Sequence, residues 1–256
     1  MIKSIKNFFK EYGKALIFFG ISGLIGGFFV GLYMLDSYPE EIRQQILDQG
    51  LNNVTLGLVS ALQAAGYGVV LGAIGLAIGK RLGLVGREEK VGFSGIISAV
   101  AVAIVGGITI IVPDMLIFGK YSEAIMDSYS QKPSVDYIIG ALIYGGVIEE
   151  VMLRLFMMSL VAYVLNMFTR NRGGKPSDAV LVAANIISAL LFAAAHLPAT
   201  STLLGITPMS LLRCFLLNGG IGLLFGWLYR KYGLGYSMIA HAGCHAISKL
   251  IWILFI

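Results

Sequence analysis

The sequence predicts an all-α fold, a polytopic bundle of transmembrane helices, and two observations lead to this prediction. Hydrophobic residues make up 57% of the 256 residues and charged residues only 13%, far below the roughly 25% charged residues of a soluble domain. The apolar residues also gather in runs of about 20, the length that crosses a bilayer as a helix. We therefore expect residues 1–256 to form a single integral membrane domain.

Seven apolar runs are candidate spans, and six to eight spans fit the uncertainty of their ends. The fourth run has about 32 residues, long enough to be strongly tilted, to project from the bilayer or to break into two helices. The runs are approximately Ala15–Leu35, Thr55–Gly79, Val91–Val112, Tyr137–Phe168, Ala179–Leu197, Leu211–Tyr229 and Leu234–Phe255.

Lysine and arginine residues are distributed unevenly between the loops. Most precede the first span or lie between spans two and three, after span four and after span six: Lys3, Lys6, Lys10, Lys14, Lys80, Arg81, Arg87, Lys90, Arg170, Arg172, Lys175, Arg230 and Lys231. The alternate loops hold only Arg43, Lys120, Lys132 and Arg213. Cytoplasmic loops carry such an excess, which predicts a cytoplasmic N-terminus and an outside C-terminus, in the plasma membrane if the protein is bacterial. The net charge of +5 is explained by this pattern, so we expect the lipid bilayer as a partner and no nucleic acid.

The N-terminal spans, residues 15–112, contain no motif of catalytic residues. Gly23, Gly27 and Gly31 follow one another at intervals of four, and small-residue stripes of this kind allow helices to approach closely. We expect this part to contribute packing, while residues 137–256 form the motif-bearing core.

That core contains charges inside an apolar run. In "IYGGVIEEVMLRLFMM", residues 143–158, Glu149, Glu150 and Arg154 interrupt more than a helical turn of apolar residues on either side. Glu150 and Arg154 are four apart with the acid first, the spacing at which helical ion pairs meet best. Glu149 is rotated from Glu150 by about 100° in an α-helix, so it points elsewhere and lacks a local partner. We expect Glu149 to be the chemical residue, because an unpaired carboxylate can accept a proton as a general base.

The three histidines of the chain also lie in apolar segments. Ionisable groups at membrane depth are unfavourable and usually face a functional interior. His196 follows Phe192 by four residues, so the ring can orient the imidazole, and His241 and His245 share one helix face. Together with Glu149 these histidines could complete a zinc ligand set. Lys249 continues the stripe and would oppose a metal cation, unless it snorkels toward the outer surface. The sequence leaves open whether the cofactor is a divalent metal such as zinc or none.

These motifs resemble those of the CPBP intramembrane proteases, which include type II CAAX prenyl endopeptidases and bacterial Abi proteins. "EEVMLR" is similar to EExxxR, "FAAAH" to FxxxH and "HAGCH" to HxxxN, in family order and in separate spans. The resemblance implies a helical-bundle endopeptidase that cuts a membrane-associated, possibly lipidated protein or peptide near its C-terminus. It implies that Glu149 and His196 activate water, and that His241 and residue 245 stabilise the oxyanion.

One position departs from the family pattern, since His245 stands where the family usually has asparagine. An imidazole N–H can also donate to an oxyanion, and Asn218 is a further candidate for the missing amide. A non-catalytic scaffold or bacteriocin-immunity protein that retains the fold is the alternative, and a proton-coupled transporter is a third.

The depths of the histidines raise a difficulty for a single site. At about 1.5 Å per residue, His241 lies roughly 10 Å and His196 roughly 25 Å from the cytoplasmic ends of their spans. We therefore expect some spans to be tilted, broken or vertically offset.

Overall fold

The structure is a computed structural model that describes residues 2–86, 92–169 and 174–256. Within these ranges the regular elements are helices and no strand occurs, so the predicted all-α class is confirmed. Some predicted features lie outside the described residues, namely Val91 of the third predicted span and the basic residues Arg87, Lys90, Arg170 and Arg172.

The N-terminal part consists of two long helical passes joined by a short surface helix. Its elements are α1 (Ile2–Ser37), α2 (Glu40–Asp48), α3 (Asn53–Gly66), the π-helical segment η1 (Tyr67–Leu71) and α4 (Gly72–Leu82). α1 packs along α3 at the glycine stripe, where a Cβ added at Gly23 would lie 2.6 Å from the backbone of Ala64 and Ala65. A larger side chain would separate the two helices, so the predicted packing role of the stripe is confirmed.

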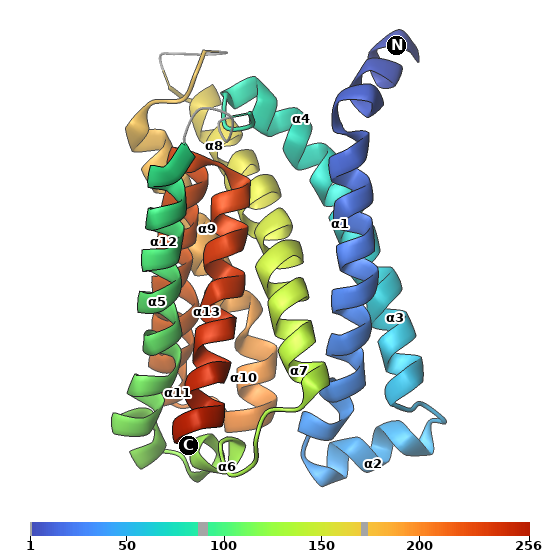
Figure 1. Ribbon diagram of the computed structural model, residues 1–256, viewed down its shortest axis with the longest axis vertical. Helices are drawn as coiled ribbons and strands as arrows, with labels where there is room; N and C mark the ends of the chain where they lie inside the picture. Colours follow the sequence, from blue (N-terminus) through green and yellow to red (C-terminus); the bar gives the residue numbers. More distant parts are fainter. Residues whose placement is uncertain (1, 87–91, 170–173) are drawn as a thin grey trace.

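The next pass is the long helix α5, which leads into short elements at the end of the molecule opposite the N-terminus (Figure 1). The elements are α5 (Gly92–Leu116), the 3₁₀ turn η3 (Phe118–Lys120) and α6 (Glu123–Ser128).

The fourth predicted span is one continuous helical pass. It comprises α7 (Val135–Gly140), the π-helical segments η4 (Ala141–Glu149) and η5 (Val151–Met158), and α8 (Ser159–Met167). No break separates these elements in the chain. The charged motif therefore lies in the middle of a helix with widened winding, and the question of one helix or two is settled in favour of one.

The remaining helices form three further passes. They are α9 (Asp178–Ala195), α10 (Leu197–Leu204), α11 (Pro208–Cys214), the π-helical segment η6 (Phe215–Gly220), α12 (Ile221–Tyr232) and α13 (Leu234–Phe255). Gly233 has φ +114°, a conformation that favours glycine, and it forms the tight turn between α12 and α13.

The number of passes agrees with the predicted range. Six helices of the described residues are long and apolar enough to cross a bilayer. The pass from Val135 to Met167 is less apolar because it carries Glu149, Glu150 and Arg154, and it brings the count to seven. The protein is a polytopic integral membrane protein.

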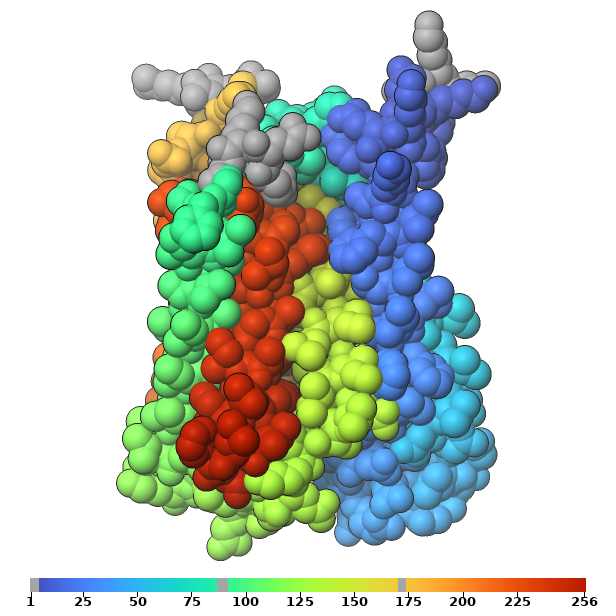
Figure 2. Space-filling model, viewed as in Figure 1, coloured from blue at the N-terminus to red at the C-terminus, as the bar shows by residue number. Residues whose placement is uncertain are grey.

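The passes pack as a bundle with the termini at opposite ends (Figure 1). Figure 2 shows α13 between α5 and the residues of α7 and η4, with α1 on the far side of that central pass.

At the N-terminal end, Lys80 pairs with Glu11 of α1, and Lys175, Arg230 and Lys231 surround one cavity. The basic residues thus gather at one end as the loop pattern requires, while the assignment of that end to the cytoplasm stays a prediction.

A buried ion pair ties the opposite end together. Asp114 of α5 is fully buried and accepts two hydrogen bonds of 2.6 Å from Arg213 of α11. Tyr129, which follows α6, donates to the same carboxylate at 2.9 Å and packs its ring against Trp252 of α13. The sequence pattern places Arg213 at the boundary of a loop, and in the structure its pair with Asp114, together with Tyr129, links α11, α5 and the residue after α6.

Candidate active site

Glu149 and Glu150 lie at the junction of η4 and η5 and differ in their exposure. The Glu150 side chain is fully buried, whereas 19% of the Glu149 side chain is exposed. A carboxylate excluded from water must be compensated by donors or cations, so the partners of Glu150 identify its role.

Glu150 is the centre of a polar network. Arg154, one turn later, places Nε 3.5 Å from its carboxylate, which confirms the predicted ion pair. His241 of α13 donates from Nδ1 to Glu150 at 2.8 Å, and Ser237, one turn before His241, also donates to the carboxylate. Ser237 was not predicted as a site residue, although its spacing of four from His241 places it on the same helix face.

Arg154 is enclosed by α9 and α12. Its Nη2 donates to the Gly222 carbonyl at 3.0 Å, and its guanidinium lies over the rings of Phe192 and Phe225 at 4.8 and 5.4 Å. The aromatic faces and the Glu150 carboxylate together compensate the buried cation. Arg154 therefore acts as a scaffold that fixes Glu150.

His241 lies between the two glutamates. Its Nδ1 faces Glu150, and its Nε2 lies 3.7 Å from Glu149 Oε2. The prediction that Glu149 points away from the surroundings of Glu150 is wrong, because both carboxylates reach the same imidazole, whereas no hydrogen-bond or ion-pair partner of Glu149 on its own helix is present among the described residues. A separation of 3.7 Å exceeds a direct hydrogen bond and is short enough for a shared water or substrate oxygen.

Aromatic contacts fix the two histidines of α13. The His241 ring stacks on Phe225 at 4.4 Å and on His245 at 5.0 Å. Gly145 lies against both imidazoles, since a Cβ added there would be 2.7 Å from His245 Nε2 and 3.5 Å from His241 Nε2. Gly145 was not predicted as a site residue, although it precedes Glu149 by one turn, and nothing in the sequence pointed to Phe225.

His196 reaches the cluster through Phe192. It caps the C-terminal end of α9, and its Nδ1 donates to the Phe192 carbonyl at 2.8 Å, which leaves Nε2 as an acceptor. The Phe192 ring lies 4.8 Å from the His196 ring and 6.0 Å from the His241 ring. The predicted contact of Phe192 with His196 is confirmed, and the same ring also contacts His241 of α13.

Two residues take positions that the sequence did not predict. Asn218 donates its amide to the Cys214 carbonyl one turn earlier at 3.0 Å, which directs it along its own helix. Lys249 does not snorkel to the outer surface, because it is only 5% exposed, donates to the Tyr137 hydroxyl at 3.2 Å and lies over the same ring.

The arrangement does not assemble the candidate zinc ligands. Across residues 2–86, 92–169 and 174–256, no three His, Cys, Asp or Glu side chains converge as a metal-binding group. His241 bonds Glu150 through Nδ1 and His196 bonds a carbonyl through Nδ1, so Nε2 is the nitrogen that each ring has left for another ligand. Glu149, His196, His241 and His245 are nevertheless not brought together as a ligand group among the described residues.

A comparison with protein families agrees with the position of these residues. The family model described as type II CAAX prenyl endopeptidase Rce1-like matches residues 132–247. The matched range contains the glutamate pair, Arg154 and the three histidines. No curated protein and no solved structure matches the chain.

Proposed function

Because the family model of Rce1-like type II CAAX prenyl endopeptidases matches residues 132–247 of the chain, we propose that the chain is a member of this family and an intramembrane endopeptidase acting on a lipidated substrate. In this proposal it hydrolyses a peptide bond near the C-terminus of a membrane-associated protein or peptide. The observation that supports this most strongly is the pair of carboxylates on one imidazole, with His241 2.8 Å from Glu150 and 3.7 Å from Glu149.

Glu149 is the general base of the proposed reaction. It is the more exposed of the two glutamates, and its carboxylate takes a proton from water while the water oxygen attacks the peptide carbonyl carbon. The C–N bond then breaks, and Glu149 returns the proton to the leaving nitrogen. The products are a carboxylic acid and an amine, and the enzyme regains its initial state.

His196 orients the attacking water in this proposal. Its Nδ1–H is held by the Phe192 carbonyl, so the Nε2 lone pair can accept a hydrogen bond from the water that Glu149 deprotonates. Phe192 is the positioning residue, since its backbone fixes the tautomer and its ring fixes the imidazole plane.

His241 and His245 stabilise the oxyanion in this proposal. The Glu150 carboxylate compensates a positive charge on His241, and the charged ring carries an Nε2–H that can donate to the oxyanion. His245 stacks on His241 and supplies a second N–H where the family usually has an amide. Buried donors held by packing need no reorganisation during the reaction, which is how such groups lower the barrier.

Cleavage of a defined peptide by the reconstituted full-length protein tests the proposal. We would use proteoliposomes and a farnesylated peptide that ends in a CAAX sequence, with a fluorophore and a quencher on either side of the bond. We expect wild type to cleave it, Glu149→Gln and His196→Ala to lose at least 100-fold in rate, and Glu41→Gln on the surface helix α2 to match wild type. Cleavage by Glu149→Gln at the wild-type rate would contradict the assigned base, and an uncleaved peptide with wild type would contradict the substrate class.

A further inference from the structure

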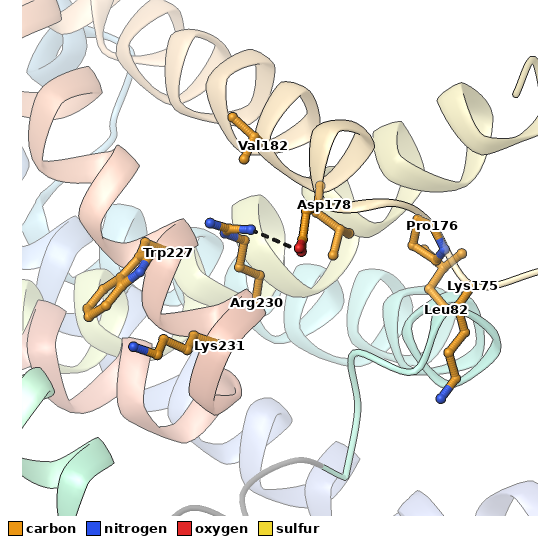
Figure 3. Close-up of a pocket in the computed structure, with 9 residues that line it drawn as sticks. Leu82, Lys175, Pro176, Asp178, Val182, Trp227, Arg230 and Lys231 are labelled. Atoms are coloured by element: carbon orange, nitrogen blue, oxygen red, sulfur yellow. Dashed lines mark ion pairs between the residues drawn. The ribbon is translucent and has the colours of Figure 1, made fainter.

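A second site lies at the N-terminal end of the bundle, away from the glutamate pair. A cavity of about 570 Å³ opens there between the end of α4, the segment before α9, the first turn of α9 and the last turns of α12. Figure 3 shows Arg230 and Asp178 in its centre, Trp227 and Lys231 on one side, and Lys175 with Leu82 on the other. None of these residues belongs to the proposed catalytic machinery.

The cavity carries an excess of positive charge. Lys175, Arg230 and Lys231 line it together with one acid, Asp178. Arg230 Nη1 lies 3.7 Å from Asp178 Oδ1, whose side chain is 96% exposed, and such exposed pairs are weak. Among the described residues, the lining thus holds three cations and one acid, an excess of positive charge of the kind found in phosphate-binding sites.

The backbone of α9 adds to this potential. α9 is 18 residues long and begins at Asp178, with Ser177 as its N-cap, and its first turn contributes to the cavity wall. The N-terminus of a helix carries a partial positive charge that favours anions. Ser177 already accepts a hydrogen bond from the Val180 N–H, and Asp178 lies in the first turn, so the helix end adds only a partial positive potential to that of the cations.

The position of the cavity indicates where its ligand comes from. It lies where α4 and α12 end and α9 begins, and these are segments of helices long and apolar enough to cross a membrane, so in a bilayer it would lie at the level of the headgroups. Leu82 and the Trp227 ring supply apolar wall beside the cations, and tryptophan is enriched at this level of membrane proteins. Lys231 Nζ is held 5.1 Å from the Trp227 ring centroid, at the boundary between the polar and the apolar parts.

We propose that this cavity binds the phosphate headgroup of an anionic phospholipid, with Arg230 at the phosphate, Lys175 and Lys231 contributing positive charge from opposite sides, and Trp227 beside the glycerol and acyl region. Basic pockets between transmembrane helices bind anionic headgroups in this manner. A soluble phosphate offers the same charge and lacks the acyl chains, so the two sources can be separated by experiment. The proposal depends on the membrane embedding of the chain and not on its protease activity.

Binding of defined lipids to the full-length protein in detergent tests the proposal. Native mass spectrometry would compare dioleoylphosphatidylglycerol, dioleoylphosphatidylcholine and soluble glycerol 3-phosphate. We expect phosphatidylglycerol to bind at least ten-fold more tightly than either of the other two. Equal affinity for phosphatidylcholine would overturn the anionic headgroup, and equal affinity for glycerol 3-phosphate would assign the cavity to soluble phosphate and overturn the lipid.

Charge-matched variants locate the site. Lys175→Gln/Lys231→Gln removes two charges from the cavity, and Lys120→Gln/Lys132→Gln removes two from the opposite end. We expect the cavity variant to lose about 30-fold in phosphatidylglycerol affinity and the control to stay within two-fold of wild type. Equal losses in both variants would overturn the site.

A charge-conserving variant separates binding from folding. Lys175→Arg/Lys231→Arg keeps both cations and is expected to bind as wild type does. If the glutamine variant does not fold, the arginine variant and the lipid series with wild type still test the proposal. Weak phosphatidylglycerol binding by either of these two folded proteins would contradict it. Peptide cleavage is not part of the readout, so a failure here is distinct from a failure of the proposed protease function.

Discussion

Replacing either of the two adjacent glutamates with glutamine is expected to affect different properties of the protein. Glu150→Gln removes the only carboxylate within 4 Å of Arg154 among the described residues, while Arg154 itself is 1% exposed. Glu149→Gln alters a side chain that is partly exposed and whose contact with His241 is 3.7 Å long. We expect the first substitution to act mainly on stability and the second mainly on catalysis.

The magnitude follows from the burial of the pair. Leaving one partner of a buried ion pair without its counter-charge typically costs 3–5 kcal/mol, and the weakened bonds to His241 and Ser237 add in the same direction. For a chain of this size, about 1 kcal/mol corresponds to roughly 2–4 °C in midpoint. We therefore expect Glu150→Gln to melt roughly 6–20 °C below wild type, and Glu149→Gln to stay within about 1 kcal/mol of it, because its contact is longer than a hydrogen bond.

Thermal unfolding of detergent-purified variants, together with peptide cleavage at a temperature where each is folded, measures both effects. A double variant, Glu150→Gln/Arg154→Met, provides the internal check, because it removes the buried cation along with its partner and is expected to melt above Glu150→Gln alone. The reasoning is refuted if Glu150→Gln melts with wild type, or if Glu149→Gln is the less stable of the two single variants.

Three further outcomes are expected. Gly145→Ala places a Cβ 2.7 Å from His245 Nε2, so it is expected to displace the histidine pair and to lower kcat by at least ten-fold. Gly13→Ala is the control, because its Cβ meets no atom within 4 Å, and it is expected to leave kcat unchanged. Asp114→Asn removes the charge that pairs with Arg213 and is expected to lower the free energy of unfolding by about 2–4 kcal/mol. This loss is smaller than that expected for a fully buried pair, because the Arg213 side chain is 25% exposed. An unchanged melting midpoint would contradict this expectation. Cleavage is expected to survive prolonged dialysis against a chelator, because no metal-ligand group is assembled among the described residues, and activity that is lost and then restored by added zinc would disprove it.

Much of the fold could be predicted from the sequence, because the bilayer limits the possible structures. A helix pairs all of its backbone hydrogen-bonding groups internally, as an apolar solvent requires, so apolar runs of sufficient length indicate membrane spans. The glycine stripe at Gly23, Gly27 and Gly31 indicates where two of these helices touch. The ion pair of Glu150 and Arg154 was predictable for a similar reason. It is set by a spacing of four within a single helix and needs no knowledge of the tertiary arrangement.

Contacts between helices were not predictable in the same way. The bond from His241 to Glu150 joins residues 91 positions apart, and the pair of Asp114 and Arg213 joins residues 99 apart. Periodicity within one helix gives a residue's face but not the depth or rotation of its neighbour. Lys249 is an example. Its long side chain could have reached the membrane surface, but it extends to the Tyr137 hydroxyl instead. The sequence pattern does not show that the helix of Tyr137 lies beside that of Lys249.

The misjudged direction of Glu149 has a local cause. The predicted rotation of about 100° between Glu149 and Glu150 assumes 3.6 residues per turn, yet the two glutamates lie at the junction of two π-helical segments, η4 and η5. A helix with i→i+5 bonds is wound more widely, so consecutive side chains diverge by roughly 80°. The smaller angle lets Glu150 hold Nδ1 of His241 while Glu149 faces Nε2 of the same ring. π-Helical turns are frequent at functional sites, although η1 in the motif-free N-terminal part shows that they also occur elsewhere. A periodicity argument that assumes α-helical winding does not detect them, and here they carry both the proposed base and its scaffold.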